Sequence, residues 1–257
     1  MFRFLQLLYF SHMPIFRVIF RFFLFVIGSL LFTFTASVTK LLGYSFNRVF
    51  QSYRNWRSLM IWGLNLRVEM DGPMPAGAGV IMANHRSYLD VVFIQTETPS
   101  VFVAKASVSK WPLVSWGANA LNTVWVNRSS KESRQKTRMQ LKKRLEEGIS
   151  VVVFPEGTTH RGPETLDFKP GMFHTVAEAE LPVYAMAIEY ENPRIAWVDD
   201  DLFLPHFFEI FGQRVIRVKI KFSEPMINAD GDALREQTHY WINKQVLEFR
   251  KQWDASI

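Results

Sequence analysis

The sequence predicts an α/β fold, in which a sheet is flanked by helices and follows an N-terminal hydrophobic membrane helix or helical hairpin. Short apolar runs rich in β-branched residues recur after residue 66, and helical patterns separate several of them. Alternating strands and helices are typical of α/β proteins. The first 66 residues are rich in phenylalanine and contain no acidic side chain. We therefore assign 1–66 to membrane-anchoring and linking helices and 67–257 to one α/β domain.

Composition excludes several classes of protein. The chain has 257 residues, 48% hydrophobic and 21% charged, which excludes a disordered or fibrous chain and allows a sizeable core. Cysteine is absent, so disulfides, cysteine-ligated metal sites and thiol nucleophiles are excluded. The sequence contains no Gly-rich phosphate loop and no G-x-S-x-G. Their absence argues against an ATPase, a nicotinamide-dependent enzyme and a standard serine hydrolase.

Charge and hydropathy distinguish the N-terminal segment from the rest. Residues 1–68 contain eight basic residues and no acidic one, whereas the remainder carries 22 basic and 24 acidic residues. Between Arg21 and Lys40 lie 18 uncharged residues. A helix of that length reaches roughly 27 Å, which just matches a bilayer core. Basic residues among Phe and Leu suit anionic lipid headgroups better than nucleic acid, so the predicted partner is a membrane bilayer.

Three kinds of N-terminal segment fit these observations. A single spanning helix is one, and a monotopic or re-entrant hairpin shared with the apolar segment Phe2–Phe10 is another. A cleaved signal peptide fits less well, because the apolar core starts late and the flank after it stays basic. More basic residues follow the uncharged run than precede it, which favours a catalytic domain on the cytoplasmic side of the cell membrane.

The elements of the α/β domain can be read in order along the chain. An amphipathic linking helix is expected over residues 46–64. Apolar runs then predict strands at residues 79–83, 101–104, 123–126, 151–154, 183–190 and 215–222. Helical patterns occupy residues 130–147, whose charge is typical of a solvated surface helix, and residues 229–253.

The first candidate site follows the strand predicted at 79–83. In the segment Asn84-His85-Arg86-Ser87-Tyr88-Leu89-Asp90, an imidazole precedes a carboxylate by five positions. If Ser87 begins a helix, Asp90 lies in its first turn and leans back toward His85. A carboxylate on one imidazole nitrogen fixes the tautomer and leaves the other nitrogen free as a base. The same spacing also makes a capping box of Ser87 and Asp90, which needs no catalysis, and the segment alone leaves both interpretations open.

The second candidate site is the loop after the strand predicted at 151–154. It reads Pro155-Glu156-Gly157-Thr158, and α/β proteins place ligand contacts just after the C-terminal ends of strands. Glu156 and Thr158 are therefore candidate binding residues. The alternative is an ordinary Pro-Glu-Gly turn.

Together these segments resemble the glycerolipid acyltransferase family, the 1-acylglycerol-3-phosphate acyltransferases and their relatives. The family's N-H-x-x-x-x-D block matches Asn84, His85 and Asp90, and its F-P-E-G-T block matches residues 154–158. The other correspondences are a lysine after the first block, an arginine after a strand and a proline before a hydrophobic strand: Lys105, Arg128 and Pro182. The blocks occur in the family's order, and that combination is far more specific than any one of them.

The resemblance implies a mixed sheet of the glycerol-3-phosphate acyltransferase-like type and an O-acyltransferase activity. The enzyme would transfer a fatty acyl group from acyl-CoA or acyl carrier protein to the sn-2 hydroxyl of lysophosphatidic acid. The product would be phosphatidic acid, for phospholipid biosynthesis. Neither a cofactor beyond this acyl thioester donor nor a metal is expected, because the histidines lack zinc-ligand spacing.

The resemblance also implies a role for each matched residue. His85 would take the proton from the attacking hydroxyl, and Asp90 would hold the imidazole and stabilise the imidazolium. Lys105 and Arg128 would bind the phosphate of the lysophospholipid acceptor. The remaining substrate-binding residues would be Glu156, Gly157 and Thr158.

Two departures from the family pattern concern the acceptor. The position after the F-P-E-G-T threonine often holds Arg or Lys in the family, but here it is Thr159 and the next base is Arg161. The arginine block also lacks the usual glycine and phenylalanine. A different lysolipid, such as lyso-ornithine lipid or another lysophospholipid, is therefore the alternative acceptor. Outside this class, a membrane-tethered hydrolase and a non-catalytic membrane scaffold are the competing hypotheses.

Overall fold

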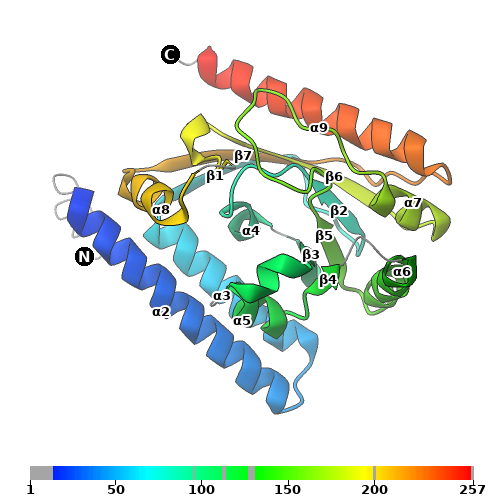
Figure 1. The fold of residues 1–257 in the computed structure, drawn as a ribbon, viewed down its shortest axis with the longest axis horizontal. Helices are drawn as coiled ribbons and strands as arrows, with labels where there is room; N and C mark the ends of the chain where they lie inside the picture. Colours follow the sequence, from blue (N-terminus) through cyan, green and yellow to red (C-terminus); the bar gives the residue numbers. More distant parts are fainter. Residues whose placement is uncertain (1–13, 95, 112–113, 127–130, 199–200, 256–257) are drawn as a thin grey trace.

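One mixed sheet organises the protein, as a computed structural model of residues 14–94, 96–111, 114–126, 131–198 and 201–255 shows (Figure 1). Within these residues seven strands are arranged in the order β1-β7-β6-β2-β5-β3-β4. The strands are β1 (Leu66–Asp71), β2 (Val80–Ala83), β3 (Ser100–Lys105), β4 (Val124–Val126), β5 (Ser150–Val153), β6 (Val183–Tyr190) and β7 (Ile216–Phe222). The predicted α/β class, with a mixed sheet flanked by helices, is confirmed.

Strand direction places both sequence motifs on one edge of the sheet. β2 runs parallel to its neighbours β5 and β6, and β3 runs parallel to β5 and β4. β7 is antiparallel to β6, and β1 is parallel to β7. The C-terminal ends of β6, β2, β5, β3 and β4 therefore lie along the same edge, and the segments that follow them meet there.

Helices cover both faces of the sheet (Figure 1). They are α2 (Pro14–Leu41), α3 (Phe46–Gly63), α4 (Asp90–Phe93), α5 (Val114–Ala120), α6 (Lys131–Glu146), α7 (Gly171–Glu178), α8 (Phe203–Gly212) and α9 (Gly231–Asp254). Short 3₁₀ turns lie at Ala106–Lys110 and Pro193–Ile195. Helices α7 and α9 lie on one face, whereas α3, α4 and α8 lie on the other and separate α2 from the sheet.

The alternation of side chains along β2 divides the core between these two faces. Ile81 and Ala83 pack with residues of α3, α4 and α8. Val80 and Met82 point the other way and pack with residues of α6, α7 and α9. Successive strand residues face opposite sides of a sheet, so a strand buried on both sides is apolar throughout.

Helix α2 is docked against the rest of the protein along its length. Pro14 occupies its first position, where a missing N–H costs nothing, and Gly43 (φ +74°) follows its end. The helix contacts α3, α5 and α8. Among the described residues, Ile15–Leu41 is the one helix that is long and apolar enough to cross a membrane. The segment Phe2–Phe10, proposed as part of a hairpin, lies outside the described residues.

Most of the elements predicted from sequence are present. The helices predicted at 46–64, 130–147 and 229–253 correspond to α3, α6 and α9, and the six predicted strands correspond to β2 through β7. Strand β1 was not predicted. It is an edge strand with Arg67, Glu69 and Asp71 exposed on one side, so it lacks the continuous apolar run that marks the central strands.

Candidate active site

Asn84 fixes the end of β2 against β6. Its side-chain amide donates to the Ile188 carbonyl (2.8 Å), and its side-chain oxygen accepts from the Ile188 N–H (2.7 Å). The side chain is fully buried and takes the place of a backbone partner for β6. This pairing sets the position at which the chain leaves the sheet, immediately before His85.

His85 and Asp90 are in direct contact. His85 Nδ1 lies 2.7 Å from Asp90 Oδ2. An ionised carboxylate only accepts hydrogen bonds, so Nδ1 carries the proton and Nε2 is the basic nitrogen of the neutral ring. The ring also stacks on Phe154, with centroids 4.1 Å apart, which limits its rotation. His85 is 22% exposed, whereas Asp90 is fully buried.

Asp90 serves both the turn and the imidazole, so the two interpretations of this motif are compatible. Its Oδ2 accepts hydrogen bonds from the Arg86 N–H (2.7 Å) and the Ser87 N–H (3.0 Å), besides its contact with His85. The bond to the Ser87 N–H is one half of a capping box. The other half is absent, because Ser87 Oγ accepts from the Leu89 N–H (3.3 Å). Holding the loop in this way positions the carboxylate beside the histidine ring.

Glu156 lies beneath the histidine backbone and is buried. Its Oε2 accepts from the His85 N–H, and its Oε1 accepts from the Leu166 N–H (2.9 Å). His160 Nε2 lies 3.3 Å from the same Oε1. Glu156 therefore ties the loop after β5 to the start of the His85 segment, an arrangement that is possible because β2 and β5 are neighbours.

Gly157 and Thr158 lie at the surface of the same loop. Gly157 has φ +75°, a left-handed conformation that favours glycine, and it follows the turn closed by its N–H and the Phe154 carbonyl (3.2 Å). The exposed Thr158 comes two positions after the buried Glu156. The loop thus presents its threonine to solvent while its glutamate faces inward.

Of the two predicted phosphate-binding residues, the structure describes the position of Lys105. Lys105 is the last residue of β3, two strands away from β2. Arg128 lies outside the described residues, two positions beyond the end of β4. The C-terminal ends of β2, β5, β3 and β4 therefore lie next to one another, in that spatial order, along the edge.

Comparison with known proteins shows which family this part of the chain resembles. The family profile described as Acyltransferase matches residues 65–189, which include β1 through β5, all of β6 except its last residue, and every predicted site residue. Residues 65–189 therefore resemble the acyltransferase family. The resemblance inferred from the motifs, and the assignment of the chain as an O-acyltransferase, are confirmed.

Proteins similar to this chain carry more than one kind of acceptor in their names. Lyso-ornithine lipid O-acyltransferase from Rhizobium meliloti (strain 1021) is 28% identical over 75% of this chain and 72% of its own length. The 1-acyl-sn-glycerol-3-phosphate acyltransferase from Neisseria gonorrhoeae is 30% identical over 49% of this chain and 51% of its own. The crystal structure of the 1-acyl-sn-glycerophosphate acyltransferase from Thermotoga maritima shares the fold, with a TM-score of 0.60, 22% identity and coverage of 90% and 98%.

Tyr190, one position beyond the matched segment, is a residue whose role the sequence did not indicate. Its hydroxyl donates to Asp90 Oδ1 (2.6 Å), on the oxygen that His85 does not contact. Complete burial raises the pKa of the Tyr190 hydroxyl well above its usual value, and the neighbouring Asp90 carboxylate raises it further. The hydroxyl therefore keeps its proton and donates a hydrogen bond to Asp90. Its position as the last residue of β6, on the edge that carries the motifs, was the available signal.

A buried ionic network behind the histidine was also missed. Arg86 Nη2 lies 2.8 Å from Glu189 Oε2, and Arg250 Nε lies 3.0 Å from the same oxygen. Arg86 Nη1 and Arg250 Nη2 both donate to the Gly162 carbonyl (3.0 and 3.2 Å). Glu189 is a charged residue within the otherwise apolar strand β6, and that irregularity was the signal for a buried partner.

The histidines do not form a metal site in the part of the chain that the structure describes. No group of three His, Asp or Glu side chains there is arranged to hold a metal ion. His160 contacts Arg86 Nη1 through Nε2 (2.6 Å), and His174 Nε2 lies 3.7 Å from Asp232.

Proposed function

We propose that this protein is a lysolipid O-acyltransferase, which transfers a fatty acyl group from an acyl thioester to a hydroxyl of a lysolipid. The observation that carries the proposal is the contact of 2.7 Å between His85 Nδ1 and the buried Asp90 Oδ2, in a segment that resembles the acyltransferase family. Among the described residues, His85 Nε2 has no hydrogen-bond partner. The partly exposed ring therefore has a free basic nitrogen for a substrate hydroxyl.

The proposed reaction is direct transfer between two substrates. His85 Nε2 removes the proton from the lysolipid hydroxyl as its oxygen attacks the thioester carbonyl carbon. The carbon–sulfur bond breaks, its electron pair leaves with the thiolate, and the imidazolium returns the proton to give a free thiol. Asp90 keeps the ring oriented and stabilises the imidazolium. A thiolate leaves readily, so the proposal includes neither a cofactor nor an enzyme nucleophile; acyl-CoA or acyl-acyl carrier protein is the co-substrate.

Two acceptors are candidates for the hydroxyl. The motif resemblance places lysophosphatidic acid first, with phosphatidic acid as the product, and the Neisseria relative supports it. Lyso-ornithine lipid is the second candidate, and the Rhizobium relative, which aligns with a larger share of the chain, supports it. Lys105 and Arg128 are the cations proposed for an acceptor phosphate, and the loop of Glu156, Gly157 and Thr158 would border the acceptor.

We also propose that the protein lies on the cytoplasmic surface of the cell membrane, with α2 parallel to the bilayer. Two basic side chains fasten the N-terminal half of α2 to the domain: Arg17 Nη1 donates to the Gly212 carbonyl (2.7 Å), and Arg21 donates to the carbonyls of Gly63 and Phe211 (3.0 and 2.8 Å). Near its other end, Lys40 Nζ donates to Asn122 (2.6 Å). A helix held to the domain at both ends favours the monotopic alternative over a spanning helix.

The outer side of α2 supplies the apolar surface for this attachment. Large apolar side chains are exposed along it: Ile15, Phe16, Ile19, Phe20, Phe23, Ile27, Leu30, Leu31, Phe34, Val38 and Leu41. So extended an apolar patch is unusual on a soluble monomer. An interfacial helix buries such a face among the lipid acyl chains.

Acceptor dependence tests the proposed reaction. Purified protein in vesicles should release thiol from labelled acyl-CoA or acyl-acyl carrier protein rapidly only when a lysolipid is present, with the label appearing in a diacylated product. His85→Ala should reduce transfer by about 10²–10⁴-fold while the protein remains folded. Rapid thiol release with water as acceptor would instead indicate a hydrolase, and unchanged cellular function of His85→Ala would indicate a scaffold.

Vesicle flotation tests the attachment. Ile27→Asp with Leu31→Asp places two charges on the outer side of α2 and should release the protein from vesicles. Gln237→Asp with Tyr240→Asp also adds two charges, on exposed positions of α9, which covers the opposite face of the sheet, and should leave binding intact. If the α2 variant stays bound after a salt wash, the attachment must involve another part of the chain.

A further inference from the structure

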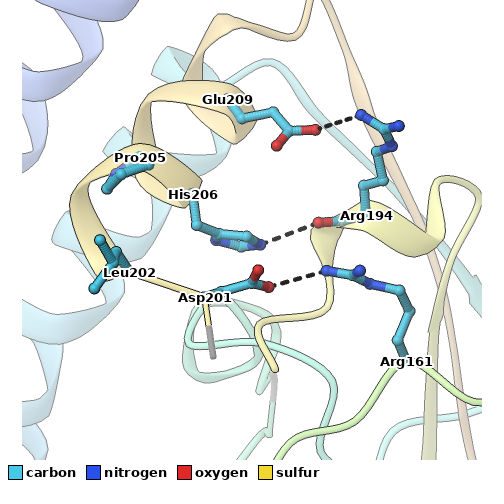
Figure 2. Close-up of a pocket in the computed structure, with 7 residues that line it drawn as sticks. All are labelled: Arg161, Arg194, Asp201, Leu202, Pro205, His206 and Glu209. Carbon is cyan, nitrogen blue, oxygen red and sulfur yellow. Dashed lines mark hydrogen bonds and ion pairs between the residues drawn. The ribbon is translucent and has the colours of Figure 1, made fainter. Parts of the chain in front are cut away.

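A second feature lies beside the His85 site and is not explained by the catalytic residues. It is a pocket of about 280 Å³ between the start of α8, the 3₁₀ turn Pro193–Ile195 and the loop after β5 (Figure 2). Four charged side chains line it: Arg161, Arg194, Asp201 and Glu209. Figure 2 shows the two arginines on one side and the two carboxylates on the other.

The charges of this pocket are balanced. Arg161 Nη2 lies 3.0 Å from Asp201 Oδ2, and Arg194 Nη1 lies 3.2 Å from Glu209 Oε1. Both pairs are partly exposed, so their charges are available to a ligand. The pocket therefore contains two cations and two anions, arranged as two facing pairs.

The histidine in the pocket is hydrogen-bonded through both ring nitrogens. His206 Nε2 lies 3.0 Å from the Arg194 carbonyl, which can only accept, so Nε2 carries the proton. His206 Nδ1 lies 3.2 Å from the Tyr88 hydroxyl. Burial raises the pKa of Tyr88 above its usual value, so this hydroxyl keeps its proton. A buried histidine with a partner on each ring nitrogen thus lies in the pocket beside the two ion pairs.

The pocket is connected to the catalytic segment by short contacts. The Arg86 carbonyl, next to His85, accepts from the Trp197 N–H (3.1 Å), and Trp197 precedes Asp201 in the same loop. Thr159 Oγ1 donates to the Trp197 carbonyl, and Arg161 is two residues further along the β5 loop. Arg161 therefore belongs to the loop that holds the His85 backbone through Glu156, and Asp201 belongs to a loop that is hydrogen-bonded to the catalytic segment.

Its opening also meets the apolar surface of the protein. Leu202 lines the pocket and is 74% exposed, and the exposed Leu204 and Phe208 follow on α8. Helix α8 packs beside α2, whose outer side is the proposed membrane contact. A lipid headgroup can therefore reach the pocket while its acyl chain stays in the apolar layer.

We propose that this pocket binds the headgroup of a zwitterionic lysolipid acceptor, one that carries an ammonium group and an acidic group with a single negative charge. The ammonium would contact Asp201 and Glu209, and the acidic group would contact the two arginines. A phosphate monoester with two negative charges would instead meet two carboxylates, and like charges are repelled. This inference rests on the proposed lysolipid acyltransferase function and decides between its two acceptors in favour of lyso-ornithine lipid.

Acceptor selectivity of the full-length protein tests the inference. The probes are lyso-ornithine lipid, lysophosphatidylethanolamine and lysophosphatidic acid, with the same acyl donor in vesicles. The wild type should have higher kcat/KM for the two zwitterionic acceptors than for lysophosphatidic acid. Glu209→Gln removes one negative charge and should lower the zwitterion-to-phosphate ratio of kcat/KM about fivefold, the effect of a partly exposed ion pair.

A matched variant isolates the position of the charge. Glu191 is 40% exposed and lies 3.2 Å from Arg217, much as Glu209 is 47% exposed and lies 3.2 Å from Arg194. Glu191→Gln should therefore leave the ratio unchanged. Preference for lysophosphatidic acid, or an equal ratio in wild type and Glu209→Gln, would overturn the headgroup inference and leave the acyltransferase proposal standing. Failure of the wild type to acylate any lysolipid would overturn both.

Discussion

The hydroxyl of Tyr190 donates a hydrogen bond of 2.6 Å to Oδ1 of Asp90, while Oδ2 of the same carboxylate faces His85. The two residues are 100 positions apart in the chain and meet because β6 lies next to β2. Each oxygen of Asp90 thus has its own donors, and the carboxylate cannot rotate without losing several bonds. The imidazole is held by a group that is itself fixed by the sheet.

Tyr190→Phe removes this donor without changing the volume of the ring. We expect a loss of stability of roughly 1.5–3 kcal/mol, because a buried carboxylate loses a charge-assisted hydrogen bond. The value of kcat should fall while KM for the acceptor changes little, because Tyr190 acts through Asp90. Thermal unfolding and steady-state kinetics measure the two effects. Tyr240→Phe, on an exposed position, is the control; a Tyr190 variant as stable and active as this control would contradict the prediction.

Asp90→Asn separates the two roles of the aspartate. An amide can still accept from the N–H groups of Arg86 and Ser87, so the turn should persist. It provides no charge to stabilise the imidazolium, so kcat should fall about 10²–10⁴-fold with little change in acceptor affinity. Kinetics combined with a thermal unfolding curve would show this pattern. A variant that lost stability but kept its kcat would restrict Asp90 to the capping role.

Stability should decrease at alkaline pH. Burial raises the pKa of Tyr53, Tyr88 and Tyr190 above the value near 10 that applies in an unfolded chain. A raised pKa in the folded state means that the stability is fully present below about pH 10 and is lost as pH rises through the folded-state values. Chemical unfolding at a series of pH values, together with tyrosinate absorbance, measures this loss. Titration of all tyrosines near pH 10 in a folded protein would refute the prediction.

Arg21→Met tests the docking of α2 on the domain. Methionine keeps much of the side-chain volume but leaves the carbonyls of Gly63 and Phe211 without their buried donor. We expect a loss of roughly 1.5–3 kcal/mol in the free energy of unfolding. Arg48→Met is the matched control, since Arg48 is exposed and packs only against the Tyr44 ring among the contacts described. Equal melting temperatures for the two variants would show that Arg21 does not hold the helix.

The sequence predicted the structure best where an apolar run marks a strand and a motif marks the loop that follows it. Apolar runs located β2 through β7, and the two motifs located His85, Asp90 and Glu156 on one edge. Helix α8 was not predicted, because its run is apolar and aromatic on nearly every side and contains Pro205. The helix packs against the sheet on one side and α2 on another, which explains its apolar surface. This arrangement is visible only in the tertiary structure.

Contacts between distant segments could not be predicted from local patterns. The motif left open whether Asp90 caps a turn or orients His85, and the structure shows one oxygen doing both. Glu156 was predicted to bind substrate. The sequence did not indicate that its carboxylate also accepts backbone N–H groups from two loops. Such roles depend on the neighbours that the sheet brings together, which a single sequence does not encode in its spacing.

The ionic network behind the histidine has a consequence for chimeric enzymes. Arg250 comes from α9, Glu189 from β6 and Arg86 from the catalytic segment, and the buried Oε2 of Glu189 contacts both arginines. Loss of a partner from a buried ionic network is destabilising. Exchange of the C-terminal helix between relatives should therefore lower stability unless the donor helix brings a base at the position of Arg250. Helix α9 and the segment that carries His85 should therefore be exchanged as a matched pair.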